Sequence, residues 1–176
     1  MSRPRNETKE DVEREQKTGQ LIEGMLSTDN ALVEMNPYLK NGMLRKLNST
    51  LENSYRLDWC IVQKFHDDAA LNGRPKVVAW SELKCRTHDS AAYPTLMLSM
   101  LKWEKGVSLS DASMVPFLVF ARFDDRISYY VRQARRDVFY PVEWGGRTKS
   151  DRGQDGDIEP VIHIPMAEFE TLCELR

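Results

Sequence analysis

The run from Val77 to Cys85 reads Val-Val-Ala-Trp-Ser-Glu-Leu-Lys-Cys, and its β-branched and aromatic residues favour a strand. Successive side chains of a strand point to opposite faces, so Glu82 and Lys84 share a face. A carboxylate beside an ammonium at a sheet surface, with a second carboxylate close by, can hold a divalent cation and activate a water molecule. Two carboxylates, an ammonium and a bound cation are the smallest set of groups that can hydrolyse a phosphodiester bond.

The surroundings of Glu82 and Lys84 distinguish this pair from the other Glu-x-Lys patterns of the chain. The same pattern occurs twice within residues 7–17, in a charged stretch that favours a helix. Side chains two positions apart on a helix diverge by about 200°, so those pairs cannot share a site. Only Glu82 and Lys84 lie where a strand makes them neighbours.

A second carboxylate, that of Asp58, is expected beside Glu82. Residues 56–65 are another strand candidate, and the connection over residues 66–75 is rich in turn-forming residues. An antiparallel hairpin centred on this connection places Asp58 opposite Glu82, with Cβ atoms about 4.5–5.5 Å apart. Two carboxylates at this spacing repel each other unless a cation or a proton lies between them.

Size and composition set the class of protein. With 176 residues, 41% of them hydrophobic, and a net charge of −2, the chain is expected to fold as one soluble domain over residues 1–176. The charge excludes a strongly basic DNA-coating protein but allows a local basic groove. The three cysteines and three histidines lack zinc-site spacing, and no apolar stretch approaches the ~18 residues of a membrane span. We therefore predict a cytoplasmic protein with free thiols and no membrane association.

The expected elements alternate between helices and strands. Residues 1–11 are polar and expected to be disordered, and residues 145–157, with four glycines, are expected to form a flexible loop. Helices are predicted over residues 11–26, 36–47, 93–105 (closed by Gly106) and 166–175, and strands over residues 56–65, 77–85, 115–121, 126–132 and 159–164. The order predicts an α/β (α+β) fold with a sheet covered by helices.

Residues 17–121, with Asp58 followed by Glu82-x-Lys84 on the next strand, resemble the PD-(D/E)xK nuclease superfamily. The resemblance implies a restriction-endonuclease-like mixed central sheet flanked by helices, although only two strands are predicted before the helix at 93–105, where that superfamily usually has three. It also implies a DNA nuclease that uses Mg²⁺ (or Mn²⁺), with small phage or mobile-element proteins as the nearest analogy.

The resemblance also implies roles for individual residues. Asp58 and Glu82, with the backbone carbonyl of Leu83, would bind the cation, and Lys84 would orient the attacking water. A glutamate on the first helix often assists in this superfamily. It matches Glu23 best, because Gly19-x-x-x-Glu23 has the spacing that often introduces it, and Glu13 and Glu15 are the alternatives.

Several further residues are candidates for contacts with DNA. Each also has a plainer interpretation as a solvated or structural side chain. The candidates are Lys102 on the predicted helix, His88 and Tyr93 just beyond the strand, and Arg132, Arg135 and Arg136, which suit backbone phosphates.

Two other functions stay open at this point. The first is a nucleic-acid-binding or regulatory protein that keeps a nuclease fold without cutting. The second is a structural protein in which Lys84 and Asp58 form a cross-strand salt bridge. The oligomeric state also stays open, and a homodimer is compatible with the sequence.

Overall fold

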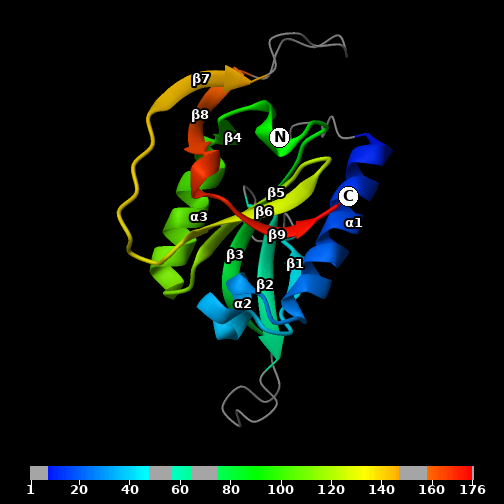
Figure 1. Ribbon diagram of the computed structural model, residues 1–176. Helices are drawn as coiled ribbons and strands as arrows, with labels where there is room; N and C mark the ends of the chain where they lie inside the picture. Colours follow the sequence, from blue (N-terminus) through cyan, green and yellow to red (C-terminus); the bar gives the residue numbers. More distant parts are fainter. Residues whose placement is uncertain (1–7, 48–56, 65–74, 147–157, 176) are drawn as a thin grey trace.

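A six-stranded mixed sheet forms the centre of the protein, and the computed structural model describes residues 8–47, 57–64, 75–146 and 158–175 of the chain. The strand order is β1-β2-β3-β5-β6-β9, in which β3 and β5 run parallel and the other neighbours run antiparallel (Figure 1). A second sheet has the order β4-β8-β7.

The elements are α1 (Lys9–Leu26), α2 (Ala31–Met35), β1 (Met43–Lys46), β2 (Trp59–Lys64), β3 (Pro75–Cys85), β4 (Thr95–Ser99), α3 (Met100–Ser113), β5 (Phe117–Arg122), β6 (Arg126–Arg132), β7 (Val142–Gly146), β8 (Ile158–Pro165) and β9 (Glu170–Glu174), with single 3-10 turns at Pro37–Leu39, Ser90–Ala92 and Met166–Glu168. The expected restriction-endonuclease-like mixed sheet with flanking helices is confirmed.

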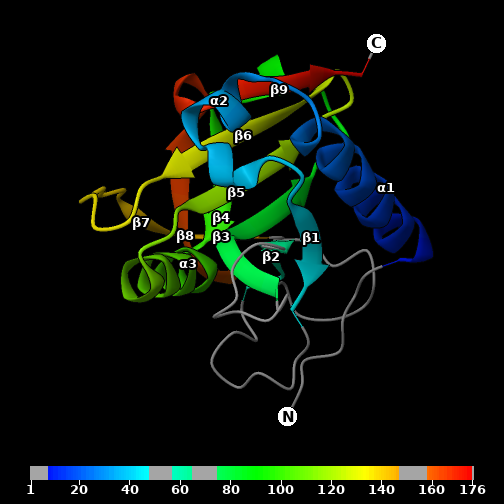
Figure 2. The same cartoon turned by 90° about the horizontal axis from the view of Figure 1, so that it is seen from below.

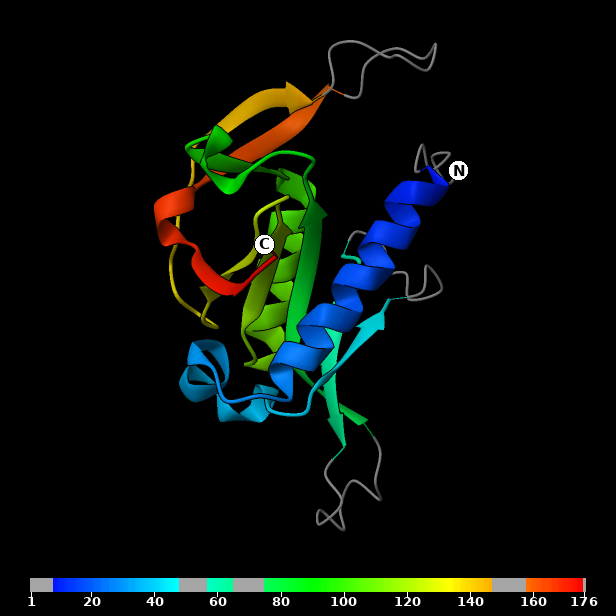
Figure 3. The same cartoon turned by 45° about the vertical axis from the view of Figure 1, so that its right-hand side comes forward.

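The helices α1 and α3 cover opposite faces of the central sheet (Figures 1, 2 and 3). Side chains alternate along β5, so Leu118 packs in the core on the α1 side, whereas Phe117 and Val119 pack in the core on the α3 side. This two-sided burial explains the continuous apolar run of residues 115–121. None of the helices in the described parts of the chain is long and apolar enough to cross a membrane.

The register of the hairpin between β2 and β3 agrees with the prediction. Trp59 pairs with Ser81 and Cys60 pairs with Trp80, which extends to Asp58 opposite Glu82. The register shifts by one residue only after Ile61, toward the turn. The turn itself lies outside the described residues.

The segment predicted as a helix over residues 93–105 is a strand followed by a helix. Residues Thr95–Ser99 form β4, which pairs with β8, and the helix α3 begins only at Met100. The alternating burial of Leu96 and Leu98 has the period of a strand. The sequence prediction was wrong here because Leu96, Met97 and Met100 also fit a helical face, and pairing with a strand more than 60 residues away decides between the two.

The predicted helix over residues 36–47 is also wrong beyond its first turn. Asn36 caps Tyr38 N–H at 3.3 Å as expected, but the turn ends at Leu39, and Asn41 then adopts a left-handed conformation with a φ of 57°. A Cβ at Gly42 would lie 2.6 Å from Ile61 and 2.8 Å from the carbonyl of Leu39, so this turn needs glycine. Residues Met43–Lys46 then form β1, so three strands of the central sheet precede α3, the number that the superfamily usually has.

The C-terminal segment differs from the prediction in the same way. Residues 166–175 were predicted as a helix, but only Met166–Glu168 makes a 3-10 turn, and β9 then pairs with β6 at the sheet edge. Within the predicted loop over residues 145–157, Gly145 and Gly146 belong to β7, and residues 147–157 lie outside the described residues. Of the predicted disordered segment 1–11, Thr8 caps α1, which starts at Lys9.

Gly106 lies inside α3 and does not end it as predicted. A Cβ at this position would lie 2.4 Å from Cζ of Phe117, so the helix approaches β5 at a distance that only glycine allows. Lys102 is one turn earlier on the same face of α3, and this close approach therefore brings Lys102 toward the sheet.

We expect Gly106→Ala to destabilise the protein by about 1–2 kcal/mol. Crowding against the Phe117 ring costs about 1–3 kcal/mol, which exceeds the gain of up to about 1 kcal/mol from alanine's helix propensity. Urea denaturation followed by circular dichroism measures the change. Gly24→Ala in α1 is the matched control, since a Cβ there meets nothing within 4 Å; a Gly106 variant as stable as this control would contradict the prediction.

Candidate active site

Two carboxylates, from β3 and from the residue before β2, meet at one ammonium. Nζ of Lys102 donates hydrogen bonds to Oδ2 of Asp58 and to Oε1 of Glu82. Because both oxygens contact the same nitrogen, the carboxylates lie within about 6 Å of each other, twice the length of an N–H···O hydrogen bond. The structure therefore brings together the two acids that the sequence paired.

Glu82 is the most enclosed member of this group. Its side chain is 0% exposed, and Nζ of Lys84 lies 2.9 Å from its Oε1. That oxygen thus takes both ammonium groups, while Oε2 is buried and has no hydrogen-bond partner among the described residues. An acceptor without a partner in a buried position is costly, so Oε2 is an oxygen that the described residues leave unsatisfied.

The charges of the lysines govern the ionisation of the site. Burial pushes the pKa of Asp58 upward, but the positive charge and hydrogen bond of Lys102, with the charges of Lys84 and Lys46, outweigh it and hold the pKa below its ordinary value. Burial lowers the pKa of Lys102, whereas the charges of Glu82 and Asp58 raise it by more, so the net shift is upward. Asp58 is therefore ionised and Lys102 charged at neutral pH.

Local structure explains how these side chains are positioned. The described pairing of β2 with β3 begins at Trp59 and Ser81, so β3 continues beyond β2 from Glu82 to Cys85. On its other edge β3 pairs with β5 as far as Cys85. Glu82 and Lys84 point to the face that α3 covers, because their partners Val119 and Ala121 pack in the core on that side. Lys102 enters from the first turn of α3.

The helix α1 lies on the other face of the sheet. Ile22, which precedes Glu23, packs with Leu83 in the core on the α1 side, so the structure does not bring Glu23 to Glu82. Of the alternatives, Glu15 lies nearer to the start of β2, where its Oε1 accepts a hydrogen bond from Trp59 Nε1 at 2.8 Å. Glu13 is exposed.

Lys46 connects Glu15 to the rim of the site. Its Nζ lies 3.4 Å from Glu15 Oε2 and 5.3 Å from the centre of the Trp59 ring. Its charge also contributes to the lowered pKa of Asp58. No sequence pattern indicated Lys46, because β1 was not predicted.

His88 and Tyr93 follow the carboxyl end of β3, as the sequence indicates. Their rings make an edge contact with centroids 4.9 Å apart, and His88 also packs near Phe123. The backbone of this loop is held to the turn between β5 and β6, since Asp125 accepts hydrogen bonds from both the backbone N–H and the hydroxyl of Ser90. Tyr93 is 61% exposed and open to a ligand from solvent.

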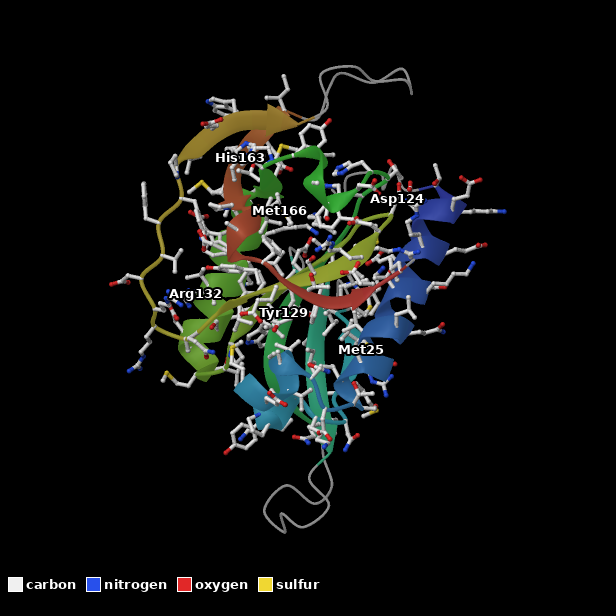
Figure 4. All side chains as sticks on the ribbon, in the orientation of Figure 1. Met25, Asp124, Tyr129, Arg132, His163 and Met166 are labelled. Atoms are coloured by element: carbon white, nitrogen blue, oxygen red, sulfur yellow. The ribbon has the colours of Figure 1, made fainter. Side chains whose placement is uncertain are left out.

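The three arginines proposed to contact phosphates have different settings. Arg132 lies beside α3 (Figure 4) and is 3% exposed. It forms a two-point ion pair with Asp111 near the end of α3, so its guanidinium has a structural partner. Arg135 donates its backbone N–H to the same carboxylate. Arg135 and Arg136 are exposed, but nine positions of α3, about 13 Å, separate Asp111 from Lys102. The structure therefore does not bring these arginines to the carboxylate pair.

The donor set suits a hard cation, although the described residues contain no ready-made cluster of three His, Cys, Asp or Glu side chains. Two carboxylates share one positive group, and the second oxygen of Glu82 has no hydrogen-bond partner among the described residues. Magnesium prefers oxygen ligands and keeps several of its waters. Asp58 and Glu82 thus fit such an ion, and the backbone of Leu83 lies between Glu82 and Lys84.

The position of Lys102 between the carboxylates is the feature that the sequence did not reveal. The sequence suggested a lysine that reaches a phosphate, on a helix thought to begin near residue 94. A later start, at Met100, places Lys102 in the first turn. Gly106, one turn after Lys102, is the residue in the sequence that could have indicated a close approach of this helix to the sheet.

Comparison with known proteins gives one finding about the family. Residues 1–172 match the family described as phage putative PDDEXK endonuclease. The match spans nearly the whole chain and includes the C-terminal region that the sequence alone left without a counterpart. No curated protein and no solved structure matches the chain.

Proposed function

Since this chain belongs to the family described as phage putative PDDEXK endonuclease, we propose that it hydrolyses phosphodiester bonds of DNA with a divalent cation held by Asp58 and Glu82. The observation that carries this proposal is the buried Glu82 carboxylate, which shares one ammonium with Asp58 and keeps one oxygen without a partner. A purely structural salt bridge needs neither the second acid nor the free oxygen. The family relationship favours the cytoplasm of the host cell as the place of action.

Mg²⁺ or Mn²⁺ is the cofactor that we propose, with the carbonyl of Leu83 as a third protein oxygen. When bound, such an ion lowers the pKa of a coordinated water and offsets charge on a phosphate. Carboxylate oxygens are the ligands that these hard ions prefer. Burial of Glu82 strengthens its attraction for a cation, because little water screens the charge.

Lys84 has the position of a residue that acts on water and phosphate. Its side chain is 22% exposed, so its ammonium contacts Glu82 and still faces solvent. An ammonium so placed can donate a hydrogen bond to the attacking water and offset the negative charge that develops on the phosphate. His88 and Tyr93 are proposed to position the DNA strand, because they follow the carboxyl end of β3, the strand that carries Glu82 and Lys84.

A cleavage assay tests this proposal. We expect the protein to cut at least one member of a panel of linear, circular and branched DNA substrates with Mg²⁺ or Mn²⁺, and to cut none of them in EDTA. Glu82→Gln protein, prepared in parallel, controls for a contaminating nuclease. If the parent protein cuts nothing with either ion but still binds DNA, the inactive DNA-binding protein becomes the better description.

A further inference from the structure

The ammonium of Lys102 occupies the position that a cation between Asp58 and Glu82 would take. It contacts one oxygen of each carboxylate and comes from α3, an element separate from both acids. Lys84 differs, since its ion pair is with Glu82. Lys102 is therefore the group among the described residues that contacts both acids and reduces the repulsion between them in the absence of a metal ion.

From this arrangement we infer that cation binding at this site is an exchange, in which the entering ion displaces the Lys102 ammonium from the two carboxylates. The inference rests on the proposed function, since it concerns the same site. Two carboxylates at this spacing need a positive charge between them, and Lys102 supplies it as a tethered counter-ion. A divalent ion must compete with that intramolecular partner, so Lys102 weakens the affinity for the free ion.

The unpartnered Oε2 of Glu82 is a carboxylate oxygen that neither lysine occupies. Both lysines bind Oε1, so an ion that displaces Lys102 finds Oε2 without a competing hydrogen bond from the described residues. A released Lys102 remains charged and stays in the first turn of α3, where it needs a new anionic partner. A phosphate of the DNA is such a partner, so cation and DNA should each strengthen the binding of the other.

Mg²⁺ binding by calorimetry, without DNA, tests the exchange. We expect Lys102→Gln to bind Mg²⁺ roughly tenfold or more tightly than the parent, because one opposite charge within about 4–6 Å shifts the proton affinity of a carboxylate by about one to three powers of ten. Lys84→Gln is the matched control: it removes the same charge from Glu82 but leaves Lys102 between the acids. Its gain should be clearly smaller. Equal gains in the two variants, or none in Lys102→Gln, would overturn the exchange.

Two further variants guard against a poorly folded Lys102→Gln. Lys102→Arg keeps the charge and should bind Mg²⁺ no more tightly than the parent; tighter binding would count against the exchange. Asp58→Asn added to Lys102→Gln should remove the gain, and a gain that persists would place the ion elsewhere and overturn the assignment.

Thermal unfolding gives a readout that is independent of cleavage. In EDTA, Lys102→Gln should melt at a lower temperature than the parent, since the two acids then lose the ammonium between them and keep only Lys84, which pairs with Glu82. Mg²⁺ should raise the melting temperature of this variant by more than it raises that of the parent. An equal rise in both would contradict the exchange.

If the parent cleaves DNA with Mg²⁺ but the variants show no difference in affinity, only this inference fails. If no cation supports cleavage by the parent, the proposed function fails.

Discussion

Glu82→Gln is expected to lower the rate of DNA cleavage by roughly 10³-fold or more, the largest effect predicted for any single change. Preorganised charge at a reacting centre is worth about 10²–10³-fold for one group, and Glu82 also carries the contact with the cation. The amide keeps the shape of the side chain, so the fold should persist. Initial rates on the preferred substrate, with circular dichroism for the fold, measure both.

Glu23 in α1 provides the comparison for Glu82. Glu23→Gln removes the same charge from a helix on the opposite face of the sheet, so we expect a rate within about twofold of the parent, the precision of the assay. A strong loss in Glu23→Gln would show that α1 contributes to the reaction after all. Full activity in Glu82→Gln would remove the proposed centre.

Lys84→Ala is expected to lose about 10²-fold or more in cleavage rate while it keeps the fold and still binds Mg²⁺. The side chain is partly exposed, and Lys102 continues to neutralise Glu82, so little stability depends on Lys84. The missing group is a single positioned charge, and about 10²–10³-fold is the scale of such a loss at a transition state. Single-turnover rates at saturating Mg²⁺ separate this loss from any change in cation binding.

A lysine on the same strand but distant from the acids serves as the control for Lys84. Lys76 pairs with Gln63 toward the turn end of β3, six positions before Glu82. Lys76→Ala should leave the cleavage rate close to that of the parent. If Lys84→Ala cuts as fast as Lys76→Ala, Lys84 only makes the strand edge soluble.

The lowered pKa of Asp58 also predicts how stability depends on pH. A carboxylate whose pKa is lower in the folded than in the unfolded protein stabilises the fold above its unfolded pKa, and this contribution disappears as the pH falls through the folded pKa. For Asp58 the unfolded value is near 3.8, so its contribution is complete at neutral pH and is lost only in acid below that value. Asp58→Asn should therefore reduce the acid sensitivity of unfolding, as urea titrations at pH 7 and pH 3 would measure.

Short-range patterns in the sequence predicted what depends on neighbouring residues. The alternation along β3 placed Glu82 and Lys84 on one face, and the turn-rich connection after β2 set a register that brings Asp58 opposite Glu82. The helix α1 was predicted over residues 11–26, close to its observed bounds Lys9–Leu26. These features depend on backbone periodicity and on short loops, both of which can be read within a window of about 30 residues.

Tertiary structure alone decided the elements whose partners lie far away in the chain. The segments β4 and β9 contain residues that fit a helix, and they become strands because β8 and β6 offer open edges for pairing. The placement of Lys102 between Asp58 and Glu82 has the same origin, since it depends on how closely α3 packs against Phe117 at Gly106. By itself the sequence determined which acids meet, because they belong to one hairpin; which lysine lies between them was decided by the packing of a helix on a strand, a contact that no local periodicity records.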